Sequence, residues 1–502
     1  MREGGDRRRV QAGEQPGGHR RAWAEGETAL GGRVPRRQAL RLGAIGAAAV
    51  SCGALFTAAG CGSAAKPGST TGGAKAKVTI RVGLYQSASQ SQWKAITAYA
   101  FPLFMKSNPD IDLVWVPEPP TSNLMQKVVT MYAAGTAPDI IQDCCSDLPT
   151  FAGKGMLLNL DPYIQADWPA NWQADFLPAQ LAAEVMTTPY NAGRFALPTY
   201  CGTMGMFYNV TRFQQLKLGT PDGSWTFADW ANAMNRLNDP SHRMYGGLIP
   251  WTPDDRLAAD LLAPYGARLV DAAHPTRCAA NTPQGVAAVS WLYDLFYVSK
   301  SVIPWNAAHW GSPSFPGLPE EGIFAQGLAS VMGEGSWLLQ RVAQAVGTKF
   351  RWAIAEPPKG PVRRSTLSTT DGYAILKTTK HAAEAWTVLS WLASSEFGRI
   401  LVERAFLQPS RKSLIPYYIR YAEASNPALK SVNLTALTDG LTKNWATPQQ
   451  FFTYEAQAMV AYKAVMSQSL YALRPTLNPQ QIVAQLATAI DAAEAKAASG
   501  GG

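Results

Sequence analysis

The alternation of short strands and helices that follows the N-terminal region most constrains how this chain can fold. Apolar and polar residues alternate over residues 78–84, and residues 111–116 and 137–142 form two more short apolar runs. Between these runs, residues 92–106 and 124–135 carry apolar side chains at helical spacing. Strands that are joined by helices pair in parallel, because each helix returns the chain to the same end of the sheet. The order of segments therefore predicts an α/β fold.

Two later segments predict places where the chain crosses from one part of the fold to another. Residues 194–198 and 204–208 are apolar runs that flank the more polar stretch 199–203. Residues 336–373 contain two short apolar runs separated by a segment rich in Pro and Gly, and they end in Ser-Thr-Thr-Asp-Gly-Tyr. Small polar residues and an aromatic ring at such a crossing can hydrogen-bond to a polar ligand and stack on it.

Helices are also predicted further along the chain. In residues 225–237, Thr226 and Asp229 stand at capping positions of a helix, and the apolar residues that follow share one helical face. Residues 382–394 and 451–466 have helical patterns as well. Asn478, followed by Pro and two Gln, predicts the start of the last helix.

Length and composition indicate a globular chain with more than one domain. The 502 residues exceed what one hydrophobic core usually covers. Sixteen Trp and eighteen Tyr suit large cores or surfaces that stack on sugar rings. The formal net charge is +9, but the first 60 residues contain ten Arg and five acidic residues, which leaves +4 for the rest. The charge therefore does not indicate a nucleic-acid partner.

Residues 1–60 have the pattern of an export signal. Arg36 and Arg37 stand in a motif similar to a twin-arginine signal, and an apolar run from Leu42 to Ala59 follows. Ala58-Ala59-Gly60-Cys61 resembles a lipobox, in which the Cys receives a lipid. We therefore expect cleavage before Cys61 and lipidation of its thiol.

A retained N-terminal anchor is the alternative, because the apolar run is about long enough to span a bilayer. Cys52 is a poorer candidate for lipidation, since Val50 and Ser51 precede it. Residues 61–76 are rich in Gly, Ser, Ala, Lys and Thr, which predicts a flexible tether between the lipid and the folded body.

Several motifs follow one another in an order that is typical of one protein family. They are Asn-Pro-Asp-Ile at 108–111, Ala-Gly-Thr-Ala-Pro-Asp-Ile at 134–140, Gly-Arg-Phe-Ala-Leu-Pro at 193–198 with Phe-Tyr-Asn at 207–209, Trp-Thr-Phe-Ala-Asp-Trp at 225–230, Gly-Ser-Trp at 335–337 and Asp-Gly-Tyr-Ala-Ile at 371–375. From about Val78 to Ala493 the chain resembles the extracellular solute-binding proteins of ABC-type sugar importers.

The resemblance implies a two-lobed α/β fold of the periplasmic-binding-protein type, with a ligand cleft between discontinuous lobes. Lobe one would comprise residues 77–199 and 374–425, and lobe two residues 200–370 and 430–495. Ligand would close the hinge between them.

The resemblance also implies a function. The protein would be an extracytoplasmic lipoprotein, anchored by its lipid to the outer face of the cell membrane. It would capture a sugar or oligosaccharide and deliver it to the transmembrane subunits of an ABC permease. We expect a monomer that is not an enzyme and that uses no cofactor.

Ligand contacts are carried over from the family onto matching positions of this chain. They are Gln86, Trp93, Asp143, Cys144, Ser146, Tyr200, Thr203, Trp251, Trp337, Thr370, Asp371, Tyr373 and Arg411. The residues alone also allow plainer roles. Core packing is the alternative for Trp93 and Trp337, hinge packing for Tyr200, a turn for Asp371, and a helix N-cap for Asp143.

The Cys144-Cys145 pair departs from the family pattern, in which polar or aromatic residues usually stand. Cys144 and Cys145 could form a vicinal disulfide or stay free, Cys201 could pair with Cys278, or either could pair with the vicinal cysteines. A metal site is not expected, because the chain has no Cys-x-x-Cys and no His-Glu-x-x-His motif.

The sequence leaves two other functional classes as alternatives. A binding protein for a non-sugar polar solute, or a sensory module, is the first, but a phosphorylated ligand would need several Arg or Lys, and the candidate segments contain almost none. An extracellular glycan-active enzyme is the second, and it would need two carboxylates that face each other across a sugar. The adjacent pairs Asp254-Asp255 and Glu320-Glu321 are interpreted as solvated surface.

Overall fold

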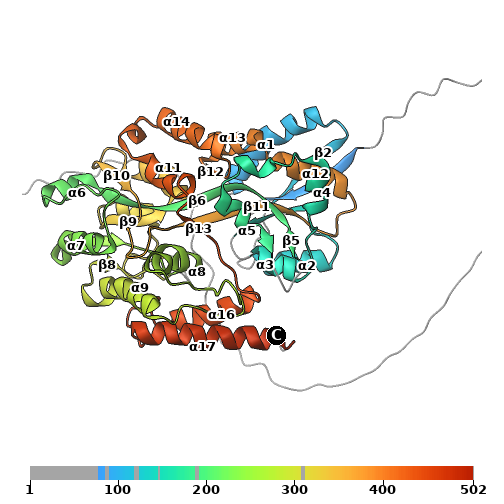
Figure 1. Ribbon diagram of the computed structural model, residues 1–502. Helices are drawn as coiled ribbons and strands as arrows, with labels where there is room; N and C mark the ends of the chain where they lie inside the picture. The colour runs from blue at the N-terminus through green and yellow to red at the C-terminus, as the bar shows by residue number, and fades with distance from the viewer. Residues whose placement is uncertain are drawn as a thin grey trace, which may run out of the picture. The chain divides into compact units, whose positions relative to one another are not determined.

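The computed structural model describes residues 77–84, 90–117, 124–144, 147–186, 192–306 and 311–500 (Figure 1). The expected signal over residues 1–60 and the tether over 61–76 lie outside this range, so both stay predictions. The described residues belong to one compact unit. None of their helices is both long and apolar enough to cross a membrane.

The first part of the chain forms the predicted succession of strands and helices. The elements are β1 (Val78–Gly83), α1 (Gln90–Ser107), β2 (Ile111–Val116), α2 (Leu124–Ala133) and β3 (Ile140–Cys144). β1 pairs in parallel with both β2 and β3. Ile80 and Val82 of β1 are fully buried, and because they are two positions apart they lie on the same face of the strand. The prediction of a parallel arrangement here is confirmed.

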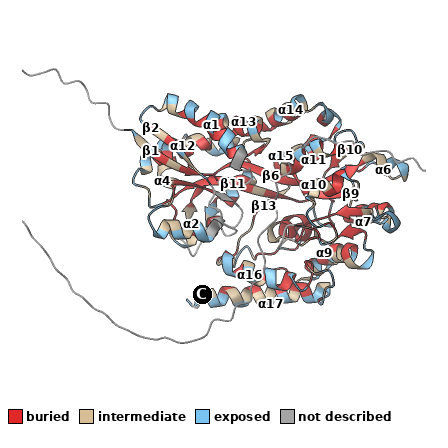
Figure 2. Cartoon of the chain, turned by 180° about the vertical axis from the view of Figure 1, so that it is seen from behind, coloured by how far each residue is buried: buried red, intermediate tan, exposed pale blue. Residues whose placement is uncertain are grey.

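These strands continue into one large mixed sheet. The other strands of its main path are β6 (Ala196–Asn209), β7 (Tyr245–Leu248), β8 (Val302–Ile303), β9 (Ala329–Gly335) and β11 (Thr366–Ile375), and the spatial order is β2-β1-β3-β11-β6-β9-β7-β8. β11 is antiparallel to both β3 and β6, and β6 is antiparallel to β9. Figure 2 shows that the strands of this sheet are buried over most of their length.

β6 is the strand that joins the two halves of the sheet. Residues 196–198 of the first expected apolar run and all of the run at 204–208 belong to one continuous strand, and all of its 14 residues are buried. Arg194 belongs to the short strand β5 (Gly193–Arg194). The first part of β6 pairs with β11, and its last part pairs with β9 and with β10 (Trp352–Ala355). The stretch 199–203 is therefore a strand crossing and not a loop.

Helices cover both faces of the sheet in each half (Figure 1). They are α3 (Asp147–Gly153), α4 (Asp161–Asp167), α5 (Pro178–Ala183), α6 (Val210–Gln215), α7 (Phe227–Leu237), α9 (Pro283–Tyr293), α10 (Glu320–Ala325), α11 (Leu339–Val346), α12 (Ala382–Leu392), α13 (Ser395–Ala405), α14 (Ile415–Ser425), α16 (Glu455–Met466) and α17 (Pro479–Ala498). Around β1 to β3, helices α1, α12 and α13 pack on one face and α2 and α3 on the other.

The hydrophobic clusters form two groups along the chain. Two clusters draw most of their residues from positions 80–200 and 373–407, and two others draw on positions 204–355 and 402–490. One difference concerns α14, which was expected in lobe one. Tyr418 and Ala422 of α14 pack with Val342 and Val346 of α11, in the second group. The exact lobe boundaries stay a prediction.

Candidate ligand-binding site

Three neighbouring strands, β3, β11 and β6, bring a buried polar group together. We call this place the crossing, because β6 passes there from one half of the sheet to the other. Asp371 of β11 lies opposite Tyr200 of β6 and opposite Cys144 of β3. The Gln142 side chain donates a hydrogen bond to the Tyr200 hydroxyl and a second one, of 3.4 Å, to Oδ1 of Asp371. All three side chains are at most 4% exposed. The structure thus joins two predicted contact residues, Tyr200 and Asp371, through a Gln that the sequence analysis did not select.

Trp337 lies close to the same crossing, at the end of β9. Its indole ring packs against the backbone of Gly202 and Gly335, where a Cβ atom would lie 2.6 and 2.3 Å from ring atoms. The guanidinium carbon of Arg256 lies 5.3 Å from the centre of the Trp337 ring. Arg256 in turn donates a 2.7 Å hydrogen bond to Glu334 within a buried ion pair. Trp337 itself is half-buried.

Thr203 joins a second polar group on the other side of β6. The hydroxyls of Thr203 and Ser336 donate to Oε1 of Gln408, at 3.3 and 3.0 Å. Gln408 of β12 (Gln408–Pro409) also donates a 2.8 Å bond to the Leu437 carbonyl. Because Thr203 is 1% exposed and hydrogen-bonded on this side, the structure gives it a role in holding β6, β9 and β12 together.

Thr370 of β11 lies beside Gln449. Its backbone N–H donates a 3.2 Å bond to Oε1 of Gln449. Its hydroxyl is buried and has no hydrogen-bond partner within the described part of the chain. Gln449 follows β13 (Ala446–Pro448), which pairs with β11. The adjacent Gln450 lines a hollow of about 430 Å³ together with Arg268 and Arg363.

A group of carboxyl side chains lies beside Arg256 and β11. We call Asp254, Asp255, Asp260, Glu334 and Glu455 the acidic group, because their charges act on one another. Burial raises the pKa of Asp254 and of Asp255, and it raises the pKa of Asp260 and Glu455 well above the usual value. Asp254 and Asp255 are half-buried, so the interpretation of this pair as solvated surface is wrong.

Three other predicted contact residues lie inside hydrophobic clusters. Trp251 is fully buried, stacks on Trp291 and donates a 3.0 Å bond to the Gly333 carbonyl. Trp93 and Tyr373, 1% and 0% exposed, pack in the cluster around β1. The structure gives these aromatic rings core contacts, which is the alternative that the sequence left open for Trp93.

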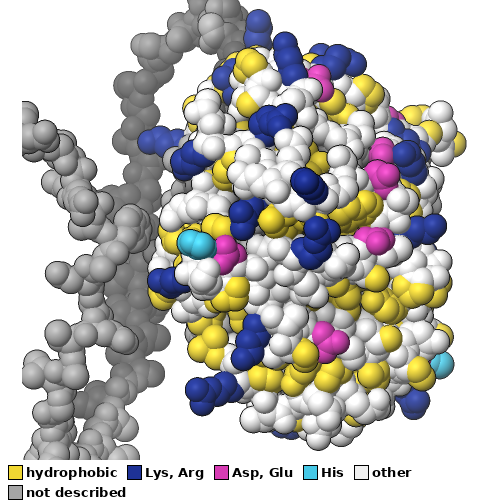
Figure 3. Space-filling model, turned by 90° about the vertical axis from the view of Figure 1, so that its left-hand side faces the viewer, with side chains coloured by type: hydrophobic (Ala, Val, Ile, Leu, Met, Phe, Trp, Pro, Cys, Tyr) yellow, Lys and Arg dark blue, Asp and Glu magenta, His cyan; other side chains and the backbone are white. Residues whose placement is uncertain are grey.

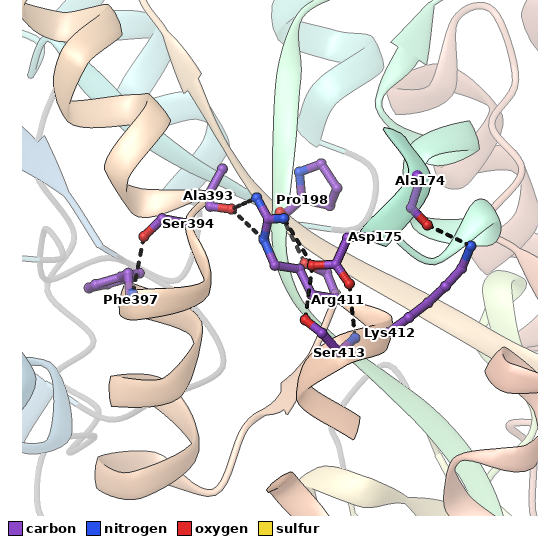
Figure 4. A network of polar contacts seen from close by, with 10 residues as sticks. Ala174, Asp175, Pro198, Ala393, Ser394, Phe397, Arg411, Lys412 and Ser413 are labelled. Atoms are coloured by element: carbon purple, nitrogen blue, oxygen red, sulfur yellow. Dashed lines mark hydrogen bonds and ion pairs between the residues drawn. The ribbon is translucent and has the colours of Figure 1, made fainter. Parts of the chain in front are cut away.

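Arg411 joins the segments that contain Asp175 and Ala393 (Figure 4). Its Nε and Nη2 atoms donate to the Ala393 carbonyl at 2.9 and 2.7 Å, and Nη1 donates to Asp175 at 3.1 Å. Its guanidinium also lies 4.0 Å from the centre of the Phe176 ring. Arg411 therefore has a packing role in this structure, which accounts for its guanidinium contacts without a ligand.

The remaining predicted residues are described in part or not at all. Gln86 and Ser146 lie outside the described residues, as does Cys61. Asp143 and Cys144 belong to β3, where Asp143 lies opposite Gly372 of β11.

The thiols of Cys201 and Cys278 are both free and buried, so the expected alternative of a Cys201–Cys278 disulfide is wrong. Burial, and then the nearby Asp371 carboxylate, raises the pKa of the Cys201 thiol well above its usual value. Among the residues described, no group of three or more His, Cys, Asp or Glu side chains could hold a metal ion. On the face shown in Figure 3, Lys and Arg side chains are spread among uncharged ones and form no continuous basic surface.

Gln142, Gln408 and Arg256 complete the site, and the sequence analysis did not select them. Gln142 offered a signal, since a lone amide in the apolar run Ile140-Ile141-Gln142 needs a buried partner. Arg256 follows two carboxylates directly, a pattern that looks like surface. Its burial depends on Glu334, which is distant in the sequence.

Comparison with known proteins agrees with this architecture. A family model described as bacterial extracellular solute-binding protein matches residues 86–398. An uncharacterized lipoprotein in the oleD 5′ region of Streptomyces antibioticus is 24% identical over 315 residues, which are 61% of this chain and 63% of that relative. The chain thus spans less than two thirds of the length of this curated relative.

Solved structures of similar fold cover almost the whole described body. The ABC substrate-binding protein Lmo0181 from Listeria monocytogenes, in complex with cycloalternan, has a TM-score of 0.68 at 19% identity, over 84% of this chain and 99% of that one. The cyclic alpha-maltosyl-1,6-maltose binding protein from Arthrobacter globiformis has a TM-score of 0.66 at 18% identity, over 83% and 99%.

The GacH receptor of Streptomyces glaucescens, solved unliganded and with acarbose, has a TM-score of 0.65 at 17% identity, over 84% of this chain and 99% of that one. These likenesses establish the two-lobed α/β fold. The family model covers more than half of the 502 residues. The chain therefore belongs to the family of bacterial extracellular solute-binding proteins.

Proposed function

We propose that this protein is the substrate-binding lipoprotein of an ABC transporter and that it captures a sugar or oligosaccharide. The observation that carries the proposal is the pairing of β6 with β11 between two groups of hydrophobic clusters, which sets Tyr200 opposite Asp371, while Trp337 packs on Gly202, two positions further along β6. Aromatic rings and planar polar groups are what sugar recognition requires. Three proteins of similar fold were solved with, or are named for, a saccharide or acarbose.

The proposed action is a conformational equilibrium without covalent chemistry. Ligand bound at the crossing contacts both lobes only when they are closed, so it stabilises the closed state by its differential affinity for that state. The closed form then presents the sugar to the transmembrane subunits of a permease. Purified protein is expected to leave oligosaccharides intact, and turnover that disappears when one carboxylate is removed would favour the glycan-active enzyme instead.

The experiment is thermal unfolding of the chain from residue 61 onward, with Cys61→Ser to keep it free of lipid. Monosaccharides, oligosaccharides, phosphorylated sugars and amino acids form the panel. A saccharide at 100 times its Kd should add about 2.7 kcal/mol to the free energy of unfolding and raise the Tm.

Trp337→Ala should remove the shift, whereas Trp391→Ala, which truncates a half-buried indole of α12, should retain it. Shifts with phosphorylated or amino-acid ligands alone would replace the sugar importer by a binding protein for another solute.

We also propose that Cys61 carries the lipid that holds the protein at the outer face of the membrane. The lipobox-like Ala-Ala-Gly-Cys sequence and the lipoprotein relative support this assignment. Cells given a labelled fatty acid should label the wild type and Cys52→Ser, but not Cys61→Ser. Label that remains in Cys61→Ser would exclude Cys61 as the modified residue.

A further inference from the structure

The acidic group places an excess of negative charge beside the proposed sugar site. Arg256 and Lys463 bring positive charge to its five carboxyl groups. The Arg256 guanidinium, however, is already engaged in the buried ion pair with Glu334. Unpaired buried carboxylates are costly, so this arrangement favours either bound protons or a cation from outside the chain.

The acidic group contacts β11 directly and reaches Thr370 through Gln449. Oδ1 of Asp260 accepts a 3.0 Å bond from the N–H of Leu367 in β11. The Gln449 side chain, which accepts the N–H of Thr370, lies against the Asp255 carboxyl group. Asp254 and Asp255 are only half-buried. Asp255 is also next in sequence to Arg256, whose guanidinium lies over the Trp337 ring.

Buried acceptor atoms without a donor collect at the same place. Oε1 of Glu455, Oδ2 of Asp260 and the hydroxyl oxygens of Thr252 and Thr370 have no hydrogen-bond partner among the residues that the structure describes. Their side chains are between 0% and 4% exposed. The Glu455 carboxyl group faces Asp254 and Asp255. Orphaned acceptors cost free energy, and a ligand that supplies N–H donors would satisfy them.

A protonated amine fits this site better than a metal ion does. No group of three or more His, Cys, Asp or Glu among the described residues is arranged to hold a metal. An ammonium group brings a positive charge and three donors, which the carboxylates can accept. We propose that the ligand is a saccharide with a protonated amine, held by the Asp254 and Asp255 carboxylates while its ring contacts Trp337. This inference rests on the proposed sugar-binding function and specifies the chemistry of its ligand.

Proton exchange gives the proposal a signature that a neutral ligand would lack. The groups that act on Asp254 and Asp255 are Arg256, Asp260, Gln449, Glu455, Lys463, Tyr462 and Tyr471. Carboxyl groups that keep protons in the empty site must release them when an ammonium binds. Binding should therefore release protons, and affinity should rise between about pH 5.5 and pH 7.0, where the amine remains charged.

The test is titration calorimetry of the chain from residue 61 onward with matched saccharides. Glucosamine oligosaccharides are compared with N-acetylglucosamine and glucose oligosaccharides of the same linkage and length, and amino monosaccharides with their neutral counterparts. We expect the amino members to bind at least about tenfold more tightly, with release of protons. Asp255→Asn and, separately, Asp254→Asn should remove this preference, and Asp112→Asn, a change at an exposed carboxylate of β2, should keep it.

Each outcome decides between the two proposals. Neutral sugars that bind as well as the amino sugars, with Asp254→Asn and Asp255→Asn unchanged, would overturn the inference and leave the sugar-binding function intact. If no saccharide binds, whether amino or neutral, both the proposed function and this inference would be overturned. The melting temperature and circular dichroism of each variant show whether it is folded. If only one of the two Asp variants folds, that variant alone is enough to test the inference.

Discussion

The packing of Trp337 on two glycines makes the site sensitive to a single methyl group. A Cβ at position 202 would lie 2.6 Å from the indole ring, closer than packed atoms tolerate. Gly202→Ala should cost about 1–3 kcal/mol of the free energy of unfolding and displace the ring, so it should also weaken the ligand identified by the panel. Urea unfolding and calorimetry measure the two effects. Gly219→Ala, where the nearest atom is 3.7 Å away, should change neither.

Among single residues, the sequence could select only those whose chemistry is visible without partners. Tyr200, Trp337 and Asp371 combine an aromatic or acidic side chain with a position in a predicted crossing, and their part in ligand binding stays a prediction. Gln142 and Arg256 could not be selected in this way. Each depends on a partner more than 50 positions away in the sequence, and only the pairing of strands creates that contact.

Among the elements, local signals predicted helix starts well. Thr226 and Asp229 form a capping box at the start of α7, and Asn478 and Gln481 form another at α17. The helix expected from 451 begins instead at Glu455. β6 was predicted as two runs because residues 199–203 are polar, but strands on both sides of it satisfy its backbone. Local pattern cannot report that tertiary context.

Helix α17 carries a carboxyl group whose titration should be visible in stability. Burial raises the pKa of Glu494 from an ordinary value of 4.5 to about 7. Between these values the folded state keeps a proton that the unfolded state has released, so stability falls as pH rises through this window and is constant above it. From pH 5 to pH 8 this group should remove on the order of 1–3 kcal/mol.

Glu494→Gln should therefore make the decline of the unfolding free energy with pH shallower, as measured by urea unfolding across the pH range. Some decline should remain, since Glu455 and Asp260 act in the same direction. Asp112→Asn serves as the control, because its carboxylate is exposed. Equal slopes for wild type and Glu494→Gln would show that Glu494 titrates normally in the folded protein.

For the whole molecule, the proposed hinge predicts a change in size. Small-angle scattering of the chain from residue 61 onward should give a smaller radius of gyration with a saccharide that raises the Tm, because the ligand favours the closed state. A saccharide that leaves the Tm unchanged is the control and should leave the radius unchanged. Tight binding without any decrease would mean that the site forms without closure of the lobes.

The fully buried strand β6 also has a thermodynamic consequence. Its residues 196–203 are hydrogen-bonded to β11, and residues 204–208 to β9, so one strand is shared by clusters on both sides of the crossing. If one half unfolded alone, part of β6 would lose its hydrogen-bond partners and its polar backbone would be exposed. The two halves are therefore bound into one cooperative unit, in which heat should produce a single calorimetric transition rather than one for each lobe.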